Sequence, residues 1–336
     1  MKRLPILLFV LLLAVSCGRR TAEEHPVRII FDTDLGNDID DVLALEMLLN
    51  YEREGRADLL GVTLCKANPH TAEFADGYLR AAGRGDMPLG FAHRGVTPED
   101  GSYLLPTLGA SFDGQPLLSP ERTADELPEG YVLLRQLLAQ QPDASVVLVA
   151  VGPLTNIGNL LVSEADEISP LAGRELVAAK VKRVVTMAGL FGDEFDFPEW
   201  NVMCDVEAAQ RTFHLCPVML TTTGWEVGNR LLYPHESILN DFGDPEASPL
   251  AVAYCHYMEM PYDRQTWDLT AVLEAVEPGV WFDRSPRGRI RIADDGRSTL
   301  DVAAEGVQDY LIIPQERTAA ALEALVARTA GKTPEQ

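Results

Sequence analysis

Residues 27–41 read VRIIFDTDLGNDIDD, and this stretch decides the fold. The apolar run 27–31 leads into Asp, Gly and Asn, which is typical of a buried strand whose carboxyl end opens into a loop. Five carboxylates follow within ten residues, and carboxylates this close together repel one another. Because burying them unpaired would be very costly, a hard divalent cation among them is the simplest prediction. We therefore expect a metal site at the carboxyl end of a strand, where open α/β sheets bind their ligands.

Short apolar runs alternate with helical patterns along the rest of the chain. Further strands are expected at 59–64, 145–151, 181–187 and 218–222, and helices at 39–50, 71–82 and 155–161. This alternation predicts an α/β fold, a mostly parallel open sheet with helices on both faces. The remaining expectations are long loops at 92–126 and 189–199, a β-rich segment at 281–315 and a closing helix at 316–328. No internal repeat and no linker interrupts the pattern, so we expect a single domain over 26–330.

The N-terminus has the pattern of a targeting segment. Two basic residues precede an apolar run that ends in small residues before Cys17, which predicts a signal peptide over 1–16. The position of Cys17 resembles a bacterial lipobox, although Ala14 stands where Leu is more usual. On that interpretation Cys17 carries the lipid, residues 17–25 form a tether, and the protein is an exported lipoprotein on the periplasmic or outer membrane face of the cell envelope. The alternative is a secreted protein with an incidental cysteine.

The composition excludes several classes of partner. The chain carries 28 Lys and Arg against 51 Asp and Glu, a net charge of −23. Such a surface disfavours nucleic acid and offers no polybasic patch for anionic lipid, so membrane contact is expected only through the lipid anchor. The later cysteines show no CxxC spacing, which argues against zinc. They are expected to be buried free thiols, although pairing in an exported protein stays open: Cys65, Cys204, Cys216 and Cys255.

Four motifs, in order, resemble those of the inosine/uridine-preferring nucleoside hydrolases. They are the Asp cluster, VGPLTN at 151–156, EWN at 199–201 with DVEAA at 205–209, and Asp268. The resemblance implies hydrolysis of the N-glycosidic bond of a nucleoside or another riboside, giving free base and ribose, with one bound Ca²⁺. It also implies a homodimer or homotetramer, since these assemblies are common in that family.

The resemblance implies a metal site and a general base. The Ca²⁺ ligands would be the carboxylates of Asp34, Asp41 and Asp268 with the backbone carbonyl of Val151. Such a set of oxygen donors is the kind that Ca²⁺ prefers. Asp34 would also take a proton from a water molecule held by the ion.

The resemblance further implies contacts to the sugar. The ribose-binding positions match Asp40, Asn68, Glu199 and Asn201, and Asp193 falls near the place of the 5′-hydroxyl. Many family members carry the aspartate pair two residues closer to the first Asp-x-Asp than this chain does. Asp38 therefore remains the alternative to Asp40.

One departure concerns the leaving group. Some family members have His-Asp where this chain has Trp267-Asp268, and that His protonates the departing base. Trp267 instead resembles the purine-preferring branch, in which an aromatic ring stacks on the base, so purine nucleosides are favoured. The alternative is that Trp267 only packs in the core. His256 and Tyr262 are candidates for a replacement proton donor.

Two other functions remain open. A lipoprotein that kept the calcium and sugar site but lost the acid would only bind ribosides. Haloacid-dehalogenase-like phosphatases also place Asp-x-Asp after a strand, although this chain shows no convincing later Lys or acidic pair for that chemistry. Hydrolysis that depends on Asp34 would distinguish the enzyme from the binding protein.

Overall fold

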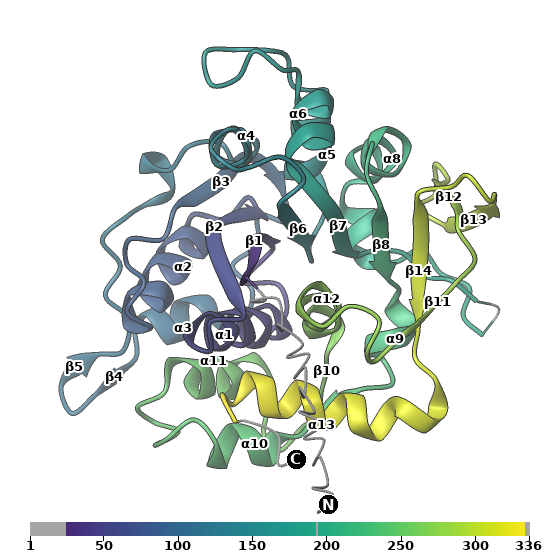
Figure 1. Ribbon diagram of the computed structural model, residues 1–336. Helices are drawn as coiled ribbons and strands as arrows, with labels where there is room; N and C mark the ends of the chain where they lie inside the picture. Colours follow the sequence, from purple (N-terminus) through teal and green to yellow (C-terminus); the bar gives the residue numbers. More distant parts are fainter. Residues whose placement is uncertain (1–24, 193, 333–336) are drawn as a thin grey trace, which may run out of the picture.

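The computed structural model describes residues 25–192 and 194–332. Its main sheet has ten strands: β1 (Val27–Thr33), β2 (Ala57–Lys66), β3 (Leu89–Val96), β6 (Val146–Ala150), β7 (Val181–Met187), β8 (Leu220–Thr223), β11 (Asp283–Arg284), β12 (Gly288–Ile292), β13 (Ser298–Val302) and β14 (Gln308–Ile312). They lie in the order β13-β12-β14-β8-β7-β6-β1-β2-β3, with β11 paired to β14 (Figure 1). The strands from β14 to β3 are parallel to one another. The antiparallel pairings of this sheet are β11 with β14, β12 with β14 and β12 with β13.

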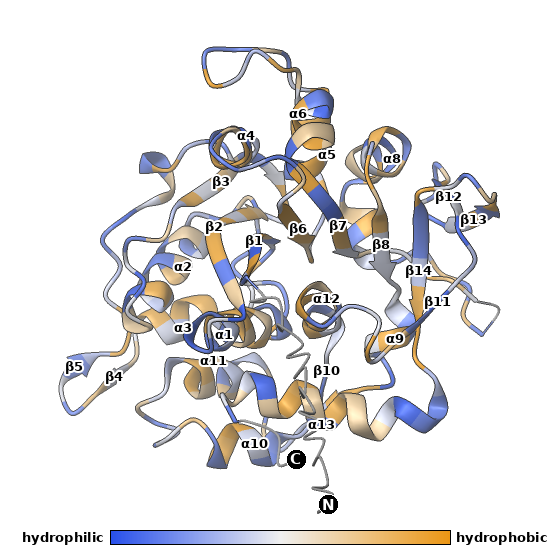
Figure 2. Ribbon diagram, viewed as in Figure 1, coloured by the Kyte–Doolittle hydropathy of each residue, from blue (hydrophilic) through white to orange (hydrophobic). Residues whose placement is uncertain are grey.

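Helices cover both faces of this sheet, and each face has its own hydrophobic core. One core includes α1 (Asp40–Arg53), α2 (Pro69–Ala81), α12 (Trp267–Val276) and α13 (Thr318–Thr329). The other includes α4 (Gly130–Ala139), α5 (Thr155–Val162), α6 (Gly173–Lys180) and α8 (Val206–Leu215). In β1, Ile29 and Phe31 belong to the first core and Ile30 to the second, as expected for a strand buried on both sides. Figure 2 shows the same property in β6, which is hydrophobic throughout.

Short elements fill the connections around the main sheet. They are α3 (Leu104–Leu108), β4 (Ser111–Phe112), β5 (Gln115–Pro116), η1 (Ala124–Glu126), α7 (Trp200–Cys204), α9 (Trp225–Gly228), β9 (Leu232–Tyr233), α10 (His235–Asn240), α11 (Pro249–Tyr257), β10 (Arg264–Gln265) and η2 (Gln315–Arg317). β4 pairs with β5, and β9 pairs with β10, in two small antiparallel sheets. Among the described residues, no helix has the length and hydrophobicity needed to cross a bilayer.

The predicted fold class is confirmed, and β7 has the predicted bounds. The long loop expected at 92–126 is wrong in part, because this segment contains the end of β3, the helix α3, the β4–β5 hairpin and η1. These elements are too short to leave a periodic pattern in the sequence. Helix α12 was also missed, because all its residues after Trp267 are buried and it has no polar face.

The predictions for the termini and cysteines have mixed outcomes. The predicted signal peptide and Cys17 lie outside the described residues. The other four cysteines are free thiols, as expected. Cys65 and Cys216 are buried, but Cys204 is only half-buried and Cys255 is exposed, so the expected burial holds for two of them.

Candidate active site

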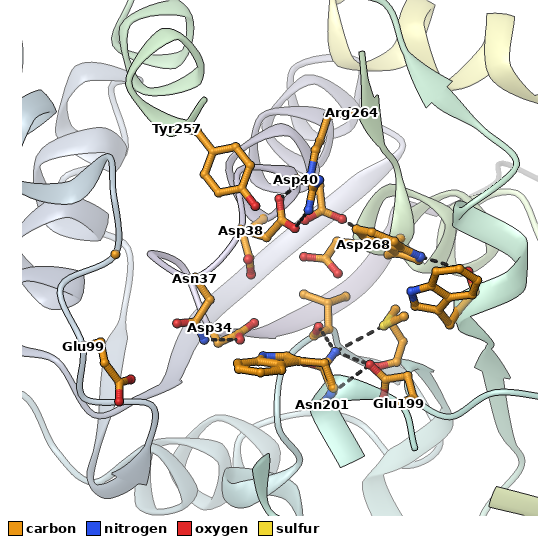
Figure 3. Close-up of a pocket in the computed structure, with 17 residues that line it drawn as sticks. Asp34, Asn37, Asp38, Asp40, Glu99, Glu199, Asn201, Tyr257, Arg264 and Asp268 are labelled. Atoms are coloured by element: carbon orange, nitrogen blue, oxygen red, sulfur yellow. Dashed lines mark hydrogen bonds and ion pairs between the residues drawn. The ribbon is translucent and has the colours of Figure 1, made fainter. Parts of the chain in front are cut away.

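A cavity of about 390 Å³ lies at the carboxyl end of the central strands and gathers acidic side chains from distant parts of the chain. The loop between β1 and α1 supplies Asp34 and Asp38, the first turn of α1 supplies Asp40 and Asp41, and the first turn of α12 supplies Asp268. Figure 3 shows Asp34, Asp40 and Asp268 converging on one space. This is the predicted place for a ligand site in a parallel sheet.

The loop that carries the acids is held by the segment before α3. The Tyr103 hydroxyl accepts a hydrogen bond from the Gly36 amide at 2.6 Å and donates one to the Asp38 carbonyl at 2.9 Å. Gly36 has φ 110°, a conformation that favours glycine. The chain can therefore turn sharply and begin α1 at Asp40, where the helix dipole favours negative charge.

Three carboxylates form the tightest group in the cavity. One oxygen from each of Asp40, Asp41 and Asp268 lies within 4.8 Å of the other two, and all three residues are buried. Burial raises each pKa well above its usual value, and the neighbouring carboxylates raise it further. Three such groups cannot all be ionised without a compensating cation. Because the group offers only oxygen donors, it fits a hard divalent cation.

Asp34 lies beside this group and is held by a chain of polar contacts. Its Oδ2 accepts a hydrogen bond from Asn37 Nδ2 at 2.6 Å, and Asn37 Oδ1 accepts one from Lys66 Nζ at 2.6 Å. Burial raises the pKa of Asp34 to about 6, although the Asn37 hydrogen bond and the Lys66 charge lower it. A Cβ at Gly152 would lie 2.5 Å from Asp34 Oδ1, so this position must lack a side chain. Asp34 is thus fixed in one orientation.

Val151, Glu199 and Asn201 also line the cavity, as the sequence predicts. The Val151 carbonyl accepts a hydrogen bond from Asn201 Nδ2 at 2.8 Å, which orients both groups. Glu199 precedes α7 and accepts backbone N–H bonds from Gly189 at 3.0 Å, Asn201 at 2.8 Å and Val202 at 3.2 Å. Burial nevertheless raises the pKa of Glu199 to about 7.

The structure does not bring Asn68 into the cavity. Its Oδ1 accepts from the His70 amide at 2.9 Å and caps α2. Its Nδ2 donates to the Pro98 carbonyl at 2.8 Å and to Asp100 Oδ1 at 2.9 Å. The ribose contact of Asn68 stays a prediction that this arrangement does not favour, because the whole amide is used to hold the helix and the following loop.

Asp38 and Asp40, the two alternatives for the ribose contact, have different partners in the cavity. Both carboxylate oxygens of Asp38 accept hydrogen bonds from Arg264, whereas Asp40 faces Asp41 and Asp268 and accepts a bond from the Asp268 amide at 3.1 Å. The predicted 5′-hydroxyl contact at Asp193 lies outside the described residues.

Trp267 lines the cavity but is covered on one side. Its indole N–H donates to the Trp225 carbonyl at 2.9 Å, and the Arg264 guanidinium lies over its ring at 5.1 Å from the centroid. Trp200 is 58% exposed and also lines the cavity, as does Trp225. Trp200 is therefore the most open aromatic surface for stacking among these three rings.

Neither candidate proton donor reaches the site. Tyr262 donates its hydroxyl to the Tyr254 carbonyl at 2.6 Å, and His256 is exposed on α11. No described histidine lines the cavity. Sequence reasoning missed the cavity residues Asn37, Tyr257 and Arg264, and also Lys66 behind them. Of these four, only Lys66 could have been noticed in the sequence, because it is a lysine at the end of an apolar strand.

Comparisons with known proteins agree with this geometry. Residues 29–328 match the family model described as inosine-uridine preferring nucleoside hydrolase. The non-specific ribonucleoside hydrolase RihC of Salmonella agona is 28% identical over 63% of this chain and 64% of its own length. The pyrimidine-specific ribonucleoside hydrolase RihA of a Shewanella species is 28% identical over 62% of each chain. The matched region thus spans slightly less than two thirds of these relatives.

Solved structures show the same fold at lower identity. A purine-preferring ribonucleoside hydrolase from Gardnerella vaginalis has a TM-score of 0.67 at 18% identity, covering 90% of this chain and 98% of that one. An inosine-uridine preferring nucleoside hydrolase from Bacillus anthracis has a TM-score of 0.61 at 16% identity, covering 90% and 99%.

Proposed function

The chain belongs to the inosine-uridine preferring nucleoside hydrolase family, and from this premise we propose that it hydrolyses the N-glycosidic bond of ribonucleosides to free base and ribose. The observation that carries the proposal is the convergence of Asp34, Asp41 and Asp268 in one cavity. The family assignment removes the phosphatase alternative, because that reaction belongs to a different family.

We propose Ca²⁺ as the cation of this site. Asp34, Asp41, Asp268 and the Val151 carbonyl would hold it, with Asp40 beside them. When bound, the ion supplies positive charge that acidifies a water molecule and orients ribose hydroxyls. The raised pKa values of the carboxylates support a bound cation, because these groups need one to remain ionised, and the all-oxygen donor set suits Ca²⁺.

The protein's own side chains then carry out the reaction. Asp34 accepts the proton of the attacking water, and Asn37 keeps the Asp34 carboxylate turned toward the cavity. Positive charge develops on the ribose ring as the bond to the base breaks. Asp40 and Glu199 supply negative charge on the cavity wall to stabilise it.

We propose that the base stacks on aromatic rings that line the cavity. Trp200 and Trp225 both line the cavity, and Phe195 and Phe197 pack edge-on against Trp225. A purine presents a larger face to these rings than a pyrimidine does, so purine nucleosides are the favoured substrates.

The test is base release from a panel of purine and pyrimidine nucleosides, with and without a chelator. The wild-type protein should release base, and the chelator should stop it. Asp34→Asn should lower kcat by roughly 10³-fold, as expected for loss of a general base. Asp58→Asn is the control and should retain full activity, because the Asp58 side chain is 47% exposed and does not line the cavity. Calcium-dependent ribose binding without turnover in the wild type would instead establish a binding protein.

We also propose that the protein is exported and anchored to the cell envelope through Cys17. The basic and apolar N-terminal pattern ending at this cysteine supports the proposal. Metabolic labelling with a radioactive fatty acid should mark the wild-type protein but not Cys17→Ser. Labelling of both, or of neither, would contradict anchoring at this residue.

A further inference from the structure

We propose that Arg264 stabilises the departing base as an anion, in place of the proton donor that the site lacks. The inference rests on the proposed nucleoside hydrolysis and concerns how the leaving group is expelled.

Arg264 places a positive charge in an otherwise acidic cavity. It is the only cationic side chain among the described residues that line the cavity, and it faces seven acidic side chains there. Its side chain is 17% exposed, so it reaches the cavity while remaining mostly enclosed. Figure 3 shows Arg264 beside Asp38 and Asp40, across the cavity from Glu199 and Asn201. A fixed positive charge thus lies next to the acidic centre.

The guanidinium is held in place from three sides. Asp38 accepts from Nε at 2.9 Å and also from Nη2, which makes a bidentate pair. The rings of Tyr257 and Trp267 each lie 5.1 Å from the guanidinium carbon. Because these contacts hold its plane, Arg264 needs little reorganisation when negative charge appears nearby.

Arg264 retains donors for a ligand. A guanidinium has five N–H groups. Within the described part of the chain, Asp38 takes two of them and Gln265 Oε1 takes a third at 3.2 Å. The other two can donate to a ring nitrogen or a carbonyl oxygen of a base. Trp267 contacts both the Arg264 guanidinium and the Trp225 ring, one of the two rings on which the base is proposed to stack.

The alternative donors are engaged otherwise, are poor acids or lie elsewhere. Both carboxylate oxygens of Glu199 already accept backbone N–H bonds, from Gly189, Asn201 and Val202, so this side chain is held as an acceptor. Tyr257 is the only tyrosine among the described lining residues, and burial together with Asp38 raises the pKa of its hydroxyl far above the usual value. Arg264 remains protonated throughout the physiological range, since burial is outweighed by the pairing with Asp38, which raises its pKa. It therefore cannot transfer a proton, but it can hold an anion.

The proposed step conserves atoms and electrons. The water oxygen bonds to C1′, and its proton passes to Asp34. The C1′–N bond breaks, and its electron pair remains on the base. Arg264 donates hydrogen bonds to that anion, which takes a proton from solvent after release. No oxidant or additional reactant is required.

Arg264→Met tests this step with two kinds of substrate. Inosine has a poor leaving group, whereas p-nitrophenyl β-D-ribofuranoside releases a stable anion without help. We expect kcat/KM for inosine to fall roughly 10- to 100-fold, the loss typical of a charge-assisted hydrogen bond. We expect the p-nitrophenyl riboside to change less than about threefold, because its leaving group needs no stabilisation. Arg230→Met, at an arginine that is 52% exposed and pairs with Glu194, is the matched control and should change neither rate.

Two further measurements keep the test decisive. Arg264→Lys keeps the charge and should retain part of the inosine rate even if Arg264→Met folds poorly. The wild-type kcat for inosine should show no fall between about pH 7 and 9, because no acid with a pKa in that range is used. Two results would overturn the inference and leave the proposed function standing. One is an equal fall in kcat/KM for both substrates in Arg264→Met, and the other is a fall in the wild-type kcat for inosine between about pH 7 and 9. Failure of the wild-type protein to cleave either substrate would overturn the proposed function, and the inference with it.

Discussion

Lys66 is a buried cation that acts on Asp34 through its charge and through one amide, that of Asn37. Its ammonium group donates to Asn37 Oδ1 at 2.6 Å and to the Thr97 carbonyl at 2.7 Å. An amide can present either its oxygen or its NH₂ group to a neighbour. Because Lys66 has only donors, it holds the amide with the oxygen toward itself and the NH₂ group toward Asp34. The orientation of the proposed base therefore depends on a residue that does not line the cavity.

Lys66→Met should lower kcat by roughly tenfold with little change in KM, which corresponds to about 1.4 kcal/mol of transition-state stabilisation. The physical reason is that Asn37 can then flip and turn its oxygen toward Asp34. Steady-state kinetics on a cleaved nucleoside would measure the effect. Lys182→Met, at an exposed position of β7, is the control. An unchanged kcat in Lys66→Met would show that the amide orientation does not depend on the lysine.

At the scale of elements, the site depends on a close approach between two loops. The segment between β3 and α3 crosses the loop between β1 and α1, and a Cβ at Gly101 would lie 2.0 Å from the Gly36 carbonyl oxygen. Backbone cannot yield as a flexible side chain does, so the two loops can pack this way only with glycine at 101. Gly101 also has φ 68°, and both Gly101 and Glu99 line the cavity.

Gly101→Ala should therefore destabilise the protein and disturb the cavity together. Gly114, at the β4–β5 turn, has φ 76°, and a Cβ added there would meet no atom within 4 Å, so Gly114→Ala reports the backbone strain alone. We expect Gly101→Ala to lower the free energy of unfolding by about 1–3 kcal/mol more than Gly114→Ala does, the usual cost of overpacking. Urea denaturation would measure both. Equal losses would mean that the two loops separate without cost.

At the scale of the whole molecule, the buried acids make stability depend on pH and on the cation. Burial raises the pKa of Asp32 to about 7, of Asp34 to about 6 and of Glu199 to about 7. Because these values exceed those of the unfolded chain, the folded state binds more protons between about pH 4 and 7. These groups therefore lower the free energy of unfolding further as pH rises through that window. A bound cation opposes this loss of stability.

We accordingly expect Ca²⁺ to raise the melting temperature more at about pH 7.5 than at about pH 5, since protons compete with the ion for the carboxylates. With the ion at 100 times its dissociation constant, the stabilisation would be about 2.7 kcal/mol. Thermal unfolding with Ca²⁺ and with a chelator at both pH values would test this. Asp268→Asn should abolish most of the difference. A Ca²⁺ effect that is larger at the lower pH would contradict the assignment of these acids as ligands.

The sequence by itself determined the architecture and the place of the site. A hydrophobic run followed by Asp, Gly and Asn is a local pattern, and local patterns report strands, helices and their ends reliably when they repeat along the chain. The α/β class, the parallel centre of the sheet and the acids after β1 follow from such patterns. The ordered motifs also identified the family over most of the chain.

Only the tertiary structure decided which side chains meet. Asp38 and Arg264 are 226 residues apart in the sequence, and nothing local to either predicts their pairing. Asn68 lies at a strand end, as expected, but the backbone of the next helix takes its amide. Contacts of this kind depend on how separate elements pack and on which polar groups burial leaves unsatisfied. These depend on the folded chain as a whole, so local periodicity cannot encode them.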